Sequence, residues 1–167
     1  MSEDSLNLEE TRAAVQQVVQ SYMVLYAQQN WDAWIDLWAD DGVLEFPFAP
    51  AGRRARYAGK ADILAYMQAT AARMGGHIKS EGLAYFRVLP MAEPGAICLE
   101  MAVKGRVVAT GAPYAQTYIS IVETRGGKIT LYREYWNPLV SIDANGGREA
   151  WTAAFGMPEN DNGGDAA

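Results

Sequence analysis

The sequence predicts an α+β domain in which helices pack on one face of a curved antiparallel sheet. Amphipathic helical patterns are concentrated in the first 74 residues, whereas residues 77–137 read as four long strands joined in sequence by turns. Helices followed by consecutive strands indicate two segregated layers. A strongly curved sheet that is closed by helices encloses a deep pocket, so a ligand cavity is expected.

Helices are expected at residues 9–29, 31–38 and 60–74. Asn30 suits the cap of the second helix, and Gly75-Gly76 is expected to end the third. A last short helix is expected at residues 148–155, over the mouth of the pocket. The first helix carries apolar residues at the spacing of a single face: Val15, Val18, Val19, Tyr22, Leu25 and Tyr26.

The strands follow from alternating patterns and from turn residues. A short strand at residues 43–48 is stopped by Pro47 and Pro50, and a basic loop, Arg53-Arg54-Ala55-Arg56, comes after it. The four long strands are expected at residues 77–89, 96–109, 114–123 and 128–137. One domain would span residues 1–156, and residues 157–167 are predicted to be a disordered tail because they are polar and rich in glycine.

Composition and charge narrow the classes of function. The 167 residues include 14 basic and 20 acidic side chains, which give a net charge of −6 and argue against nucleic acid and anionic membranes as partners. Cys98 and His77 are the only residues of their types, which excludes an internal disulfide and a metal site built from cysteines or several histidines. From these counts we expect neither a metal nor a cofactor. We expect a cytoplasmic protein, because neither a secretory signal nor a long apolar run is present.

The stretch from Lys128 to Pro138 carries the candidate chemistry. Strand alternation places Thr130, Tyr132, Glu134 and Trp136 on one face and Leu131, Arg133 and Tyr135 on the other. A carboxylate between two aromatic residues is costly to bury unless it is paired, protonated or used in a reaction. Glu134 is therefore the leading functional candidate, and the alternative is a solvent-facing glutamate paired with a neighbour such as Arg133.

Several strings resemble the superfamily of nuclear transport factor 2, ketosteroid isomerase and SnoaL-like cyclases over roughly residues 9–138. They are V-V-Q-S-Y, W-x-x-L-W-A-D-D-G-V-L-E-F-P and G-G-K-I-T-x-x-R-E-Y-W-N-P. The R-E-Y-W-N-P ending and the Y-A-Q-T-Y string of residues 114–118 are most similar to SnoaL-like and phenazine-biosynthesis A/B proteins. The resemblance implies a cone-shaped sheet wrapped by three N-terminal helices, and a homodimer formed through the outer sheet face.

The resemblance also implies roles for individual residues. Tyr22 falls where ketosteroid isomerases have an oxyanion-donating tyrosine, and Gln116 falls near their second donor. Glu134 matches the acid/base glutamate of the phenazine proteins. Two positions depart from these patterns, because Phe46 replaces the isomerase aspartate and Tyr66 replaces the phenazine-protein histidine.

Each candidate residue also has a purely structural explanation. Tyr22 could be a half-buried core aromatic, Gln116 could satisfy a backbone group, and His77 could be solvated at a strand edge. Arg53 and its basic neighbours would form a solvated loop or steer an acidic substrate. The expected pocket wall, suited to a flat or polycyclic ligand, consists of Tyr26, Trp38, Phe46, Tyr66, Leu99, Met101, Tyr114, Tyr118, Tyr132 and Trp136.

Two functions from different classes fit the sequence. The first is a cofactor-independent isomerase, cyclase or dehydratase that acts on an aromatic or polyketide-like carbonyl compound, with Glu134 moving the proton and Tyr22 and Gln116 holding the oxygen. The second is a non-catalytic member of the same fold that binds an apolar small molecule or assembles through its outer sheet face.

Overall fold

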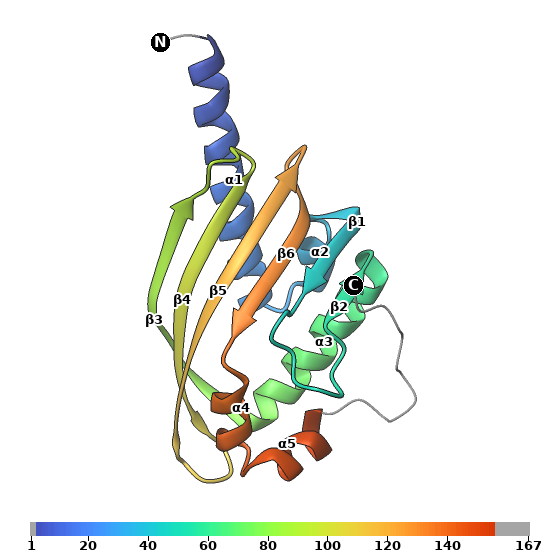
Figure 1. Cartoon of the computed structure of the whole chain (residues 1–167), viewed down its shortest axis with the longest axis vertical. Helices are drawn as coiled ribbons and strands as arrows, with labels where there is room; N and C mark the ends of the chain where they lie inside the picture. The colour runs from blue at the N-terminus through green and yellow to red at the C-terminus, as the bar shows by residue number, and fades with distance from the viewer. Residues whose placement is uncertain (1–2, 156–167) are drawn as a thin grey trace.

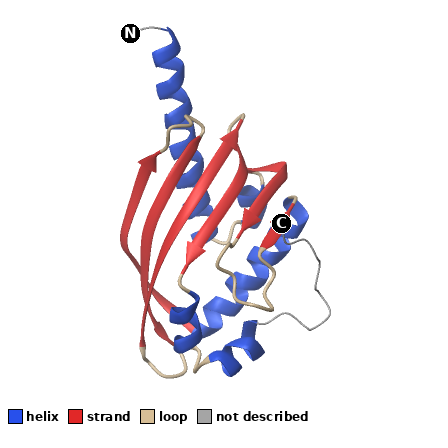
Figure 2. Ribbon diagram, in the orientation of Figure 1, coloured by secondary structure: helices blue, strands red, loops and turns tan. Residues whose placement is uncertain are grey.

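A curved sheet forms one layer of the protein, and helices α1 (Glu3–Ala27) and α3 (Lys60–His77) form the other. The computed structural model describes residues 3–155, and Figure 2 shows the helices gathered on one side of the strands. We call the sheet face that carries Tyr132 and faces the helices the inner face. This arrangement confirms the expected α+β class, while the tail at residues 157–167 lies outside the described residues.

The sheet has six strands in the order β2-β1-β6-β5-β4-β3. Strands β3 (Ile78–Pro90), β4 (Ala96–Val107), β5 (Pro113–Arg125) and β6 (Lys128–Trp136) are the four long strands expected from the sequence, and each is antiparallel to the next. Gly126 and Gly127 both have positive φ angles, 58° and 73°, which is the backbone that a two-residue hairpin between β5 and β6 requires.

The pairing of β1 (Trp38–Glu45) with β6 differs from the expected antiparallel sheet, because these two strands run parallel. The pair is separated in sequence by α3 and four strands, so no hairpin sets its direction. Strand β2 (Arg56–Ala58) pairs with β1 at the edge of the sheet and occupies part of the expected basic loop.

Helix α2 (Trp31–Ile35) is shorter than the expected 31–38. Its cap is as expected, because the Asn30 side chain accepts a hydrogen bond from the Ala33 amide at 3.4 Å. The helix stops early because the Leu37 carbonyl accepts a hydrogen bond from the Ile129 amide at 2.8 Å, and Trp38 pairs with the same residue. Sheet pairing thus takes Trp38 out of the helix.

Helix α3 continues through the glycine pair that was expected to end it. Gly75 and Gly76 keep helical backbone with negative φ, and the helix ends where Ile78 becomes extended at φ −123° and ψ 120°. His77 therefore closes the helix instead of opening a strand. A glycine pair ends a helix only when one residue takes the left-handed conformation, which neither does here.

Two short helices follow the sheet. Helix α4 (Pro138–Ala144) was not expected; it begins with the Asn137 side chain accepting from the Leu139 amide at 3.0 Å and with Pro138 in the first turn. Helix α5 (Arg148–Phe155) has the expected bounds. Figure 1 shows both below β6, next to the C-terminal half of α3.

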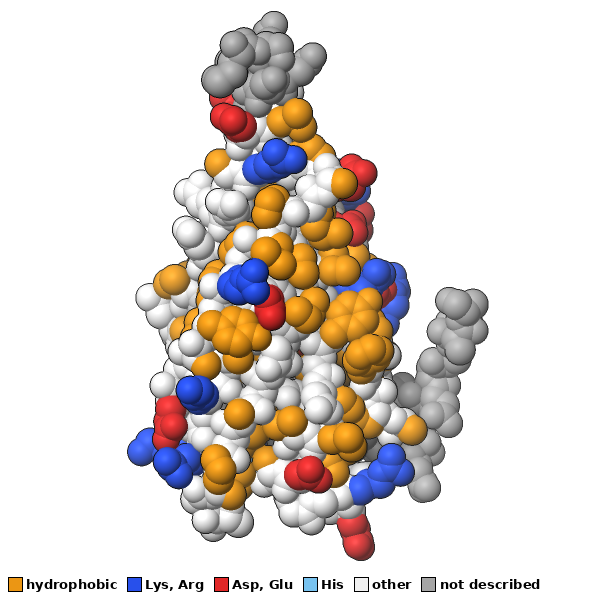
Figure 3. All heavy atoms as spheres, turned by 60° about the vertical axis from the view of Figure 1, so that its left-hand side comes forward, with side chains coloured by type: hydrophobic (Ala, Val, Ile, Leu, Met, Phe, Trp, Pro, Cys, Tyr) orange, Lys and Arg blue, Asp and Glu red, His pale blue; other side chains and the backbone are white. Residues whose placement is uncertain are grey.

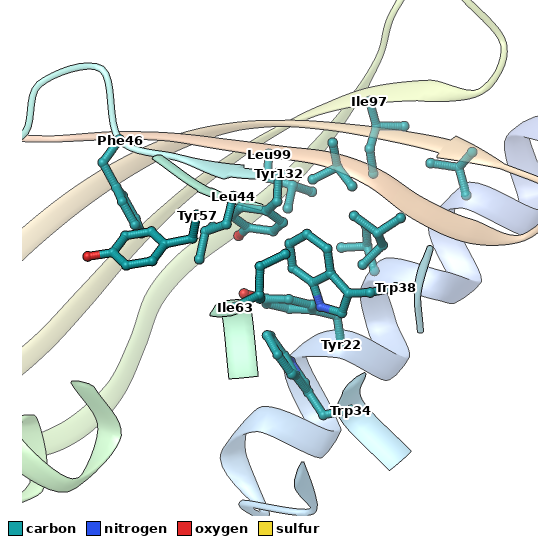
Figure 4. Close-up of a cluster of buried hydrophobic side chains, with 14 residues drawn as sticks. Tyr22, Trp34, Trp38, Leu44, Phe46, Tyr57, Ile63, Ile97, Leu99 and Tyr132 are labelled. Carbon is teal, nitrogen blue, oxygen red and sulfur yellow. The ribbon is translucent and has the colours of Figure 1, made fainter. Parts of the chain in front are cut away.

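The main core lies between α1, α2 and the inner face of the sheet (Figure 4). Tyr22 of α1 stacks on Tyr132 of β6 with 4.9 Å between ring centroids and 15° between ring planes. Trp34 and Trp38 lie beside this pair and have no exposed surface. Aromatic pairs of this kind contribute about 0.5–1.5 kcal/mol each beyond their area burial, so this cluster fixes α1 against β6.

On the outer face, side chains are held by ion pairs. Arg133 donates to Glu45 at 2.8 Å, and Arg87 donates to Glu100 at 3.0 Å. The parallel register places Glu45 directly opposite Arg133. Arg133 is thus engaged on the opposite face from Glu134, which is evidence against the solvent-facing Glu134–Arg133 pair. Among residues 3–155, no helix combines the length and apolarity needed to cross a membrane.

Candidate functional site

A cavity of about 270 Å³ lies between the inner face of the sheet and helices α1 and α3. Aromatic and methionine side chains make up most of its wall, which suits a flat apolar ligand. Its lining residues are Tyr22, Met23, Tyr26, Phe46, Arg53, Tyr66, Met67, Thr70, Met74, Met101, Val103, Tyr114, Tyr118, Tyr132, Glu134, Trp136 and Ser141.

Most of the expected site residues lie in this wall, and three do not. Trp38 and Leu99 are fully buried in the core, away from the cavity lining. Gln116 is also buried and outside the lining, and its side-chain amide donates to the Asn137 carbonyl at 2.9 Å. That carbonyl belongs to the residue that follows β6 and caps α4, so Gln116 satisfies the backbone and is not placed to donate to a ligand.

Glu134 projects from β6 into the cavity, directly opposite Ser120 of β5. It is half-buried, and no lysine, arginine or histidine in the described chain lies within ion-pair distance of its carboxyl group. Desolvation raises the pKa of Glu134 to about 7, with a smaller opposing effect from Ser120. The pKa is raised even though the residue is only half-buried, because no cation lies close enough to compensate for the lost hydration.

Five tyrosines surround this carboxyl group closely enough for its charge to raise their pKa values. Burial is the largest cause in every case, and it raises the pKa of Tyr26 to about 12. The phenols therefore remain protonated throughout the physiological range and can donate hydrogen bonds. They are Tyr22, Tyr26, Tyr114, Tyr118 and Tyr132.

Tyr22 is both a packed aromatic and a cavity residue. Its ring lies between Tyr132 at 4.9 Å and Trp34 at 5.1 Å, and only 5% of its surface is exposed. Burial raises the Tyr22 pKa well above its ordinary value, and electrostatic effects of Tyr132 and Glu134 add to this shift. The two sequence interpretations of Tyr22 are thus compatible, because the core holds the ring while the residue still lines the cavity.

Arg53 lines the cavity from the loop between β1 and β2. Its Nη2 donates to the Tyr66 hydroxyl at 2.9 Å, and its guanidinium carbon lies 5.7 Å from the ring centroid of Trp151 and 6.0 Å from that of Trp136. Its neighbour Arg54 behaves as the expected solvated loop residue and pairs with Asp62. Arg53 is therefore the member of the basic stretch that takes part in the cavity.

The SnoaL-like domain family matches residues 19–132, more than half of the chain. The chain belongs to this family. Among its relatives, the uncharacterized protein YesE of Bacillus subtilis is 37% identical over 134 residues, which cover 78% of this chain and 86% of the relative. An uncharacterized PhzA/B-like protein of Pseudomonas aeruginosa is 37% identical over 124 residues, 73% of this chain and 84% of the relative.

Solved structures agree with this assignment. The crystal structure of a candidate isomerase from Bacillus subtilis superposes with a TM-score of 0.72 at 34% identity, covering 83% of this chain and 96% of that one. The resemblance to SnoaL-like and phenazine A/B-like proteins found in the sequence is thereby confirmed.

Some lining residues of this SnoaL-like protein were not foreseen in the sequence. Thr70 and Met74 follow Tyr66 at intervals of four residues, so the helical period could have found them. Ser141 lies on α4, which the Asn137-Pro138 pair could have indicated as a helix start. Arg53 was considered only together with its basic neighbours, because a loop residue has no periodic pattern that would separate it from Arg54 and Arg56. In the described part of the chain, no three His, Cys, Asp or Glu side chains form a metal-binding group.

The raised pKa of Glu134 predicts a stability that depends on pH. Because the folded state holds this proton more tightly than the unfolded chain, the free energy of unfolding falls as the pH rises from the ordinary glutamate range of about 4.5 through about 7. We predict that, at about pH 8, the free energy of unfolding of Glu134→Gln exceeds that of the native protein by about 2 kcal/mol. Urea denaturation measures this difference, which should be much smaller at about pH 5.

The matched control for this measurement is Glu123→Gln, which removes an exposed carboxylate at the far end of β5. Its effect on unfolding should be small and similar at both pH values. A native protein that is as stable as the Glu134→Gln variant at the higher pH would show that the carboxyl group is well solvated.

Proposed function

We propose that this protein is a cofactor-independent enzyme that moves a proton beside the carbonyl group of an aromatic or polyketide-like compound. The observation that carries the proposal is the carboxyl group of Glu134, which lines an aromatic cavity without an ion-pair partner among the described residues and has a pKa raised to about 7. A group with such a pKa exchanges protons in both directions near neutral pH, as an acid/base catalyst must.

In the proposed reaction, ionised Glu134 takes a proton from the carbon next to the carbonyl. The electrons of the broken C–H bond form a C=C bond, and the carbonyl electrons move to the oxygen. Tyr22 donates a hydrogen bond to the developing enolate oxygen, and its raised pKa keeps its own proton in place. Protonated Glu134 then returns the proton to a different atom, which completes an isomerisation or sets up cyclisation or loss of water.

A second donor is needed because Gln116 is engaged with the Asn137 carbonyl. We assign this role to Tyr26, which lies one helical turn after Tyr22 with the two rings nearly parallel and their centroids 6.5 Å apart. Tyr26 also lines the cavity and remains protonated, so both donors project from one rigid helix. The comparisons support an enzyme in general terms and not these residue roles, because a solved structure that is 34% identical is described as a candidate isomerase.

The alternative function is the binding of an apolar small molecule without catalysis. Two substitutions favour it: Phe46 stands where ketosteroid isomerases have an aspartate, and Tyr66 stands where the phenazine proteins have a histidine. Phe46 is 6% exposed and packs against Tyr66 with ring centroids 5.3 Å apart, so this side of the wall offers an apolar surface where related enzymes have an acid or a histidine.

Hydrogen–deuterium exchange separates the two functions. In D₂O, we expect the native protein to accelerate loss of the proton NMR signal next to the carbonyl of at least one compound in a panel of 2-tetralone, cyclohexenones and polyketide-like diketones. We predict that Glu134→Gln lowers this acceleration about 10²- to 10⁴-fold. Tyr22→Phe should lower it about 10²- to 10³-fold, because one oxyanion donor is lost.

The control in the exchange assay is again Glu123→Gln, which should retain native exchange. Full exchange activity in the Glu134→Gln variant would contradict the acid/base assignment. A native protein that binds the panel compounds but exchanges no proton faster than buffer would favour the binding function.

We further propose that two copies associate through the outer sheet face. Tyr85, Leu89 and Ile119 lie on that face and each is more than a third exposed, at 39%, 38% and 37%. Figure 3, which brings the β3 side forward, shows apolar side chains scattered among charged ones. We predict that native protein sediments as a dimer and that Ile119→Lys sediments as a monomer, whereas Val24→Lys on α1 stays dimeric. Native protein that sediments as a monomer would refute this arrangement.

A further inference from the structure

Arg53 differs from the other arginines around the sheet. Six of them pair with a carboxylate, namely Arg54, Arg56, Arg87, Arg106, Arg125 and Arg133. Arg53 has no carboxylate partner among the described residues and instead lines the cavity. Its only hydrogen bond there is to the neutral hydroxyl of Tyr66 at 2.9 Å. A guanidinium has five N–H groups, so most of its donors remain available.

Two hydroxyl groups beside Arg53 also have protons to donate. The Tyr66 oxygen accepts from Arg53, which leaves its own O–H free to point at another acceptor. The Ser141 oxygen accepts from the Trp151 indole at 3.0 Å, and Trp151 is also within 5.7 Å of the Arg53 guanidinium. Within the described residues, neither hydroxyl has a recorded acceptor. This end of the cavity therefore presents donors from Arg53, Tyr66 and Ser141 without a matching acceptor.

Arg53 and Glu134 form two separate poles of the cavity. Both residues line the cavity, and among the described residues no ion pair joins them. Trp136 lies between these poles, since it follows Glu134 by two residues on the same strand face and its ring centroid is 6.0 Å from the Arg53 guanidinium. A ligand stacked on Trp136 could reach both poles.

The aromatic rings around Arg53 hold the guanidinium but do not neutralise it. Cation–π contacts at about 6 Å are weak and leave a full positive charge in the wall. That charge disfavours an amine or quaternary ammonium ligand, although the aromatic wall alone would suit one. A planar anion with two oxygens satisfies the guanidinium in a bidentate pair and accepts from the two hydroxyls as well.

We propose that Arg53, assisted by Tyr66 and Ser141, binds a carboxylate on the ligand, so that aromatic or cyclic carbonyl acids are preferred over the corresponding neutral ketones as substrates. The placement of the reacting carbon near Glu134 rests on the proposed function. The carboxylate site itself does not, because it depends only on the charge and donors at the other pole. Arg53 is thus a specificity-determining residue.

A matched pair of ligands tests this proposal without any turnover. Isothermal titration would compare 2-naphthoate with 2-naphthamide, together with benzoate and benzamide as a smaller pair. We predict that native protein binds the carboxylates about ten- to a hundredfold more tightly than the amides. Arg53→Met should abolish this preference while changing the affinity for 2-naphthamide by less than about threefold. Arg53→Lys should restore only part of it, because an ammonium cannot form the bidentate pair.

Two controls localise the effect. Arg54→Met removes the same charge from the adjacent position, where the guanidinium pairs with Asp62, and should leave the carboxylate preference intact. Glu123→Gln should also keep the preference, since it removes an exposed carboxylate at the far end of β5, outside the cavity lining. Circular dichroism of each variant confirms that the fold is retained, and equal amide affinity shows that the cavity is intact.

The outcomes separate this proposal from the enzyme mechanism. Native protein that binds each carboxylate no better than its amide, or that binds neither member of either pair at millimolar concentration, overturns the carboxylate site. An Arg53→Met variant that keeps the preference overturns it too. None of these results affects proton exchange by Glu134. Conversely, a clear carboxylate preference in a protein that exchanges no proton would leave the site standing as that of a binding protein.

Discussion

A carboxyl group without a cation, held among phenol rings on the inner face of β6, is the constraint on which the site depends. Burying an ionised carboxylate costs several kcal/mol unless a partner compensates. The carboxylates of the outer face, such as Glu45 and Glu100, have arginine partners. Glu134 has only Ser120 beside it to oppose the effect of desolvation. The rest of the fold must therefore supply the stability that this one group removes.

That stability comes from the aromatic contacts on both sides of Glu134. Tyr132, two residues before it, is stacked beneath Tyr22 and packed near Trp38 with 6.4 Å between centroids. Trp136, two residues after it, faces the Arg53 guanidinium. Because neighbours on the same strand face are fixed in this way, the Glu134 side chain cannot turn to the outer face without breaking the register of β6. The parallel pairing of β1 with β6 adds to this by engaging Arg133 with Glu45 on the other side.

The part of this site that sequence could predict is the part set by local periodicity. Strand alternation separates Glu134 from Arg133, and the helical period places Tyr22 and Tyr26 on one face, because both depend only on residues close in the chain. Gln116 shows the limit of that reasoning. The family resemblance implies an oxyanion donor at this position, but its hydrogen bond goes to Asn137, 21 residues away, whose position depends on how β6 ends.

Other differences have the same origin in contacts between distant residues. The helical pattern of residues 31–38 loses its last residues to pairing with Ile129, and Gly75-Gly76 stays helical because nothing at that point requires a left-handed residue. Arg53 carries no periodic signal, and only the approach of Tyr66, Trp136 and Trp151 distinguishes it from Arg54. The cavity thus combines the carboxyl group of Glu134, whose face was foreseen from the strand, with the Arg53 guanidinium, which only the fold brings to the wall.

The central claim is that Glu134 is a desolvated acid, and its own titration tests this most directly. Carbon-13 NMR of the side-chain carboxyl carbons, with Glu134 assigned by its absence in Glu134→Gln, follows the protonation of this group alone. Desolvation without a compensating cation predicts a midpoint near the pKa of about 7. A midpoint in the ordinary glutamate range of about 4.3 would contradict it, because the carboxylate would then be solvated or paired and could not act as proposed.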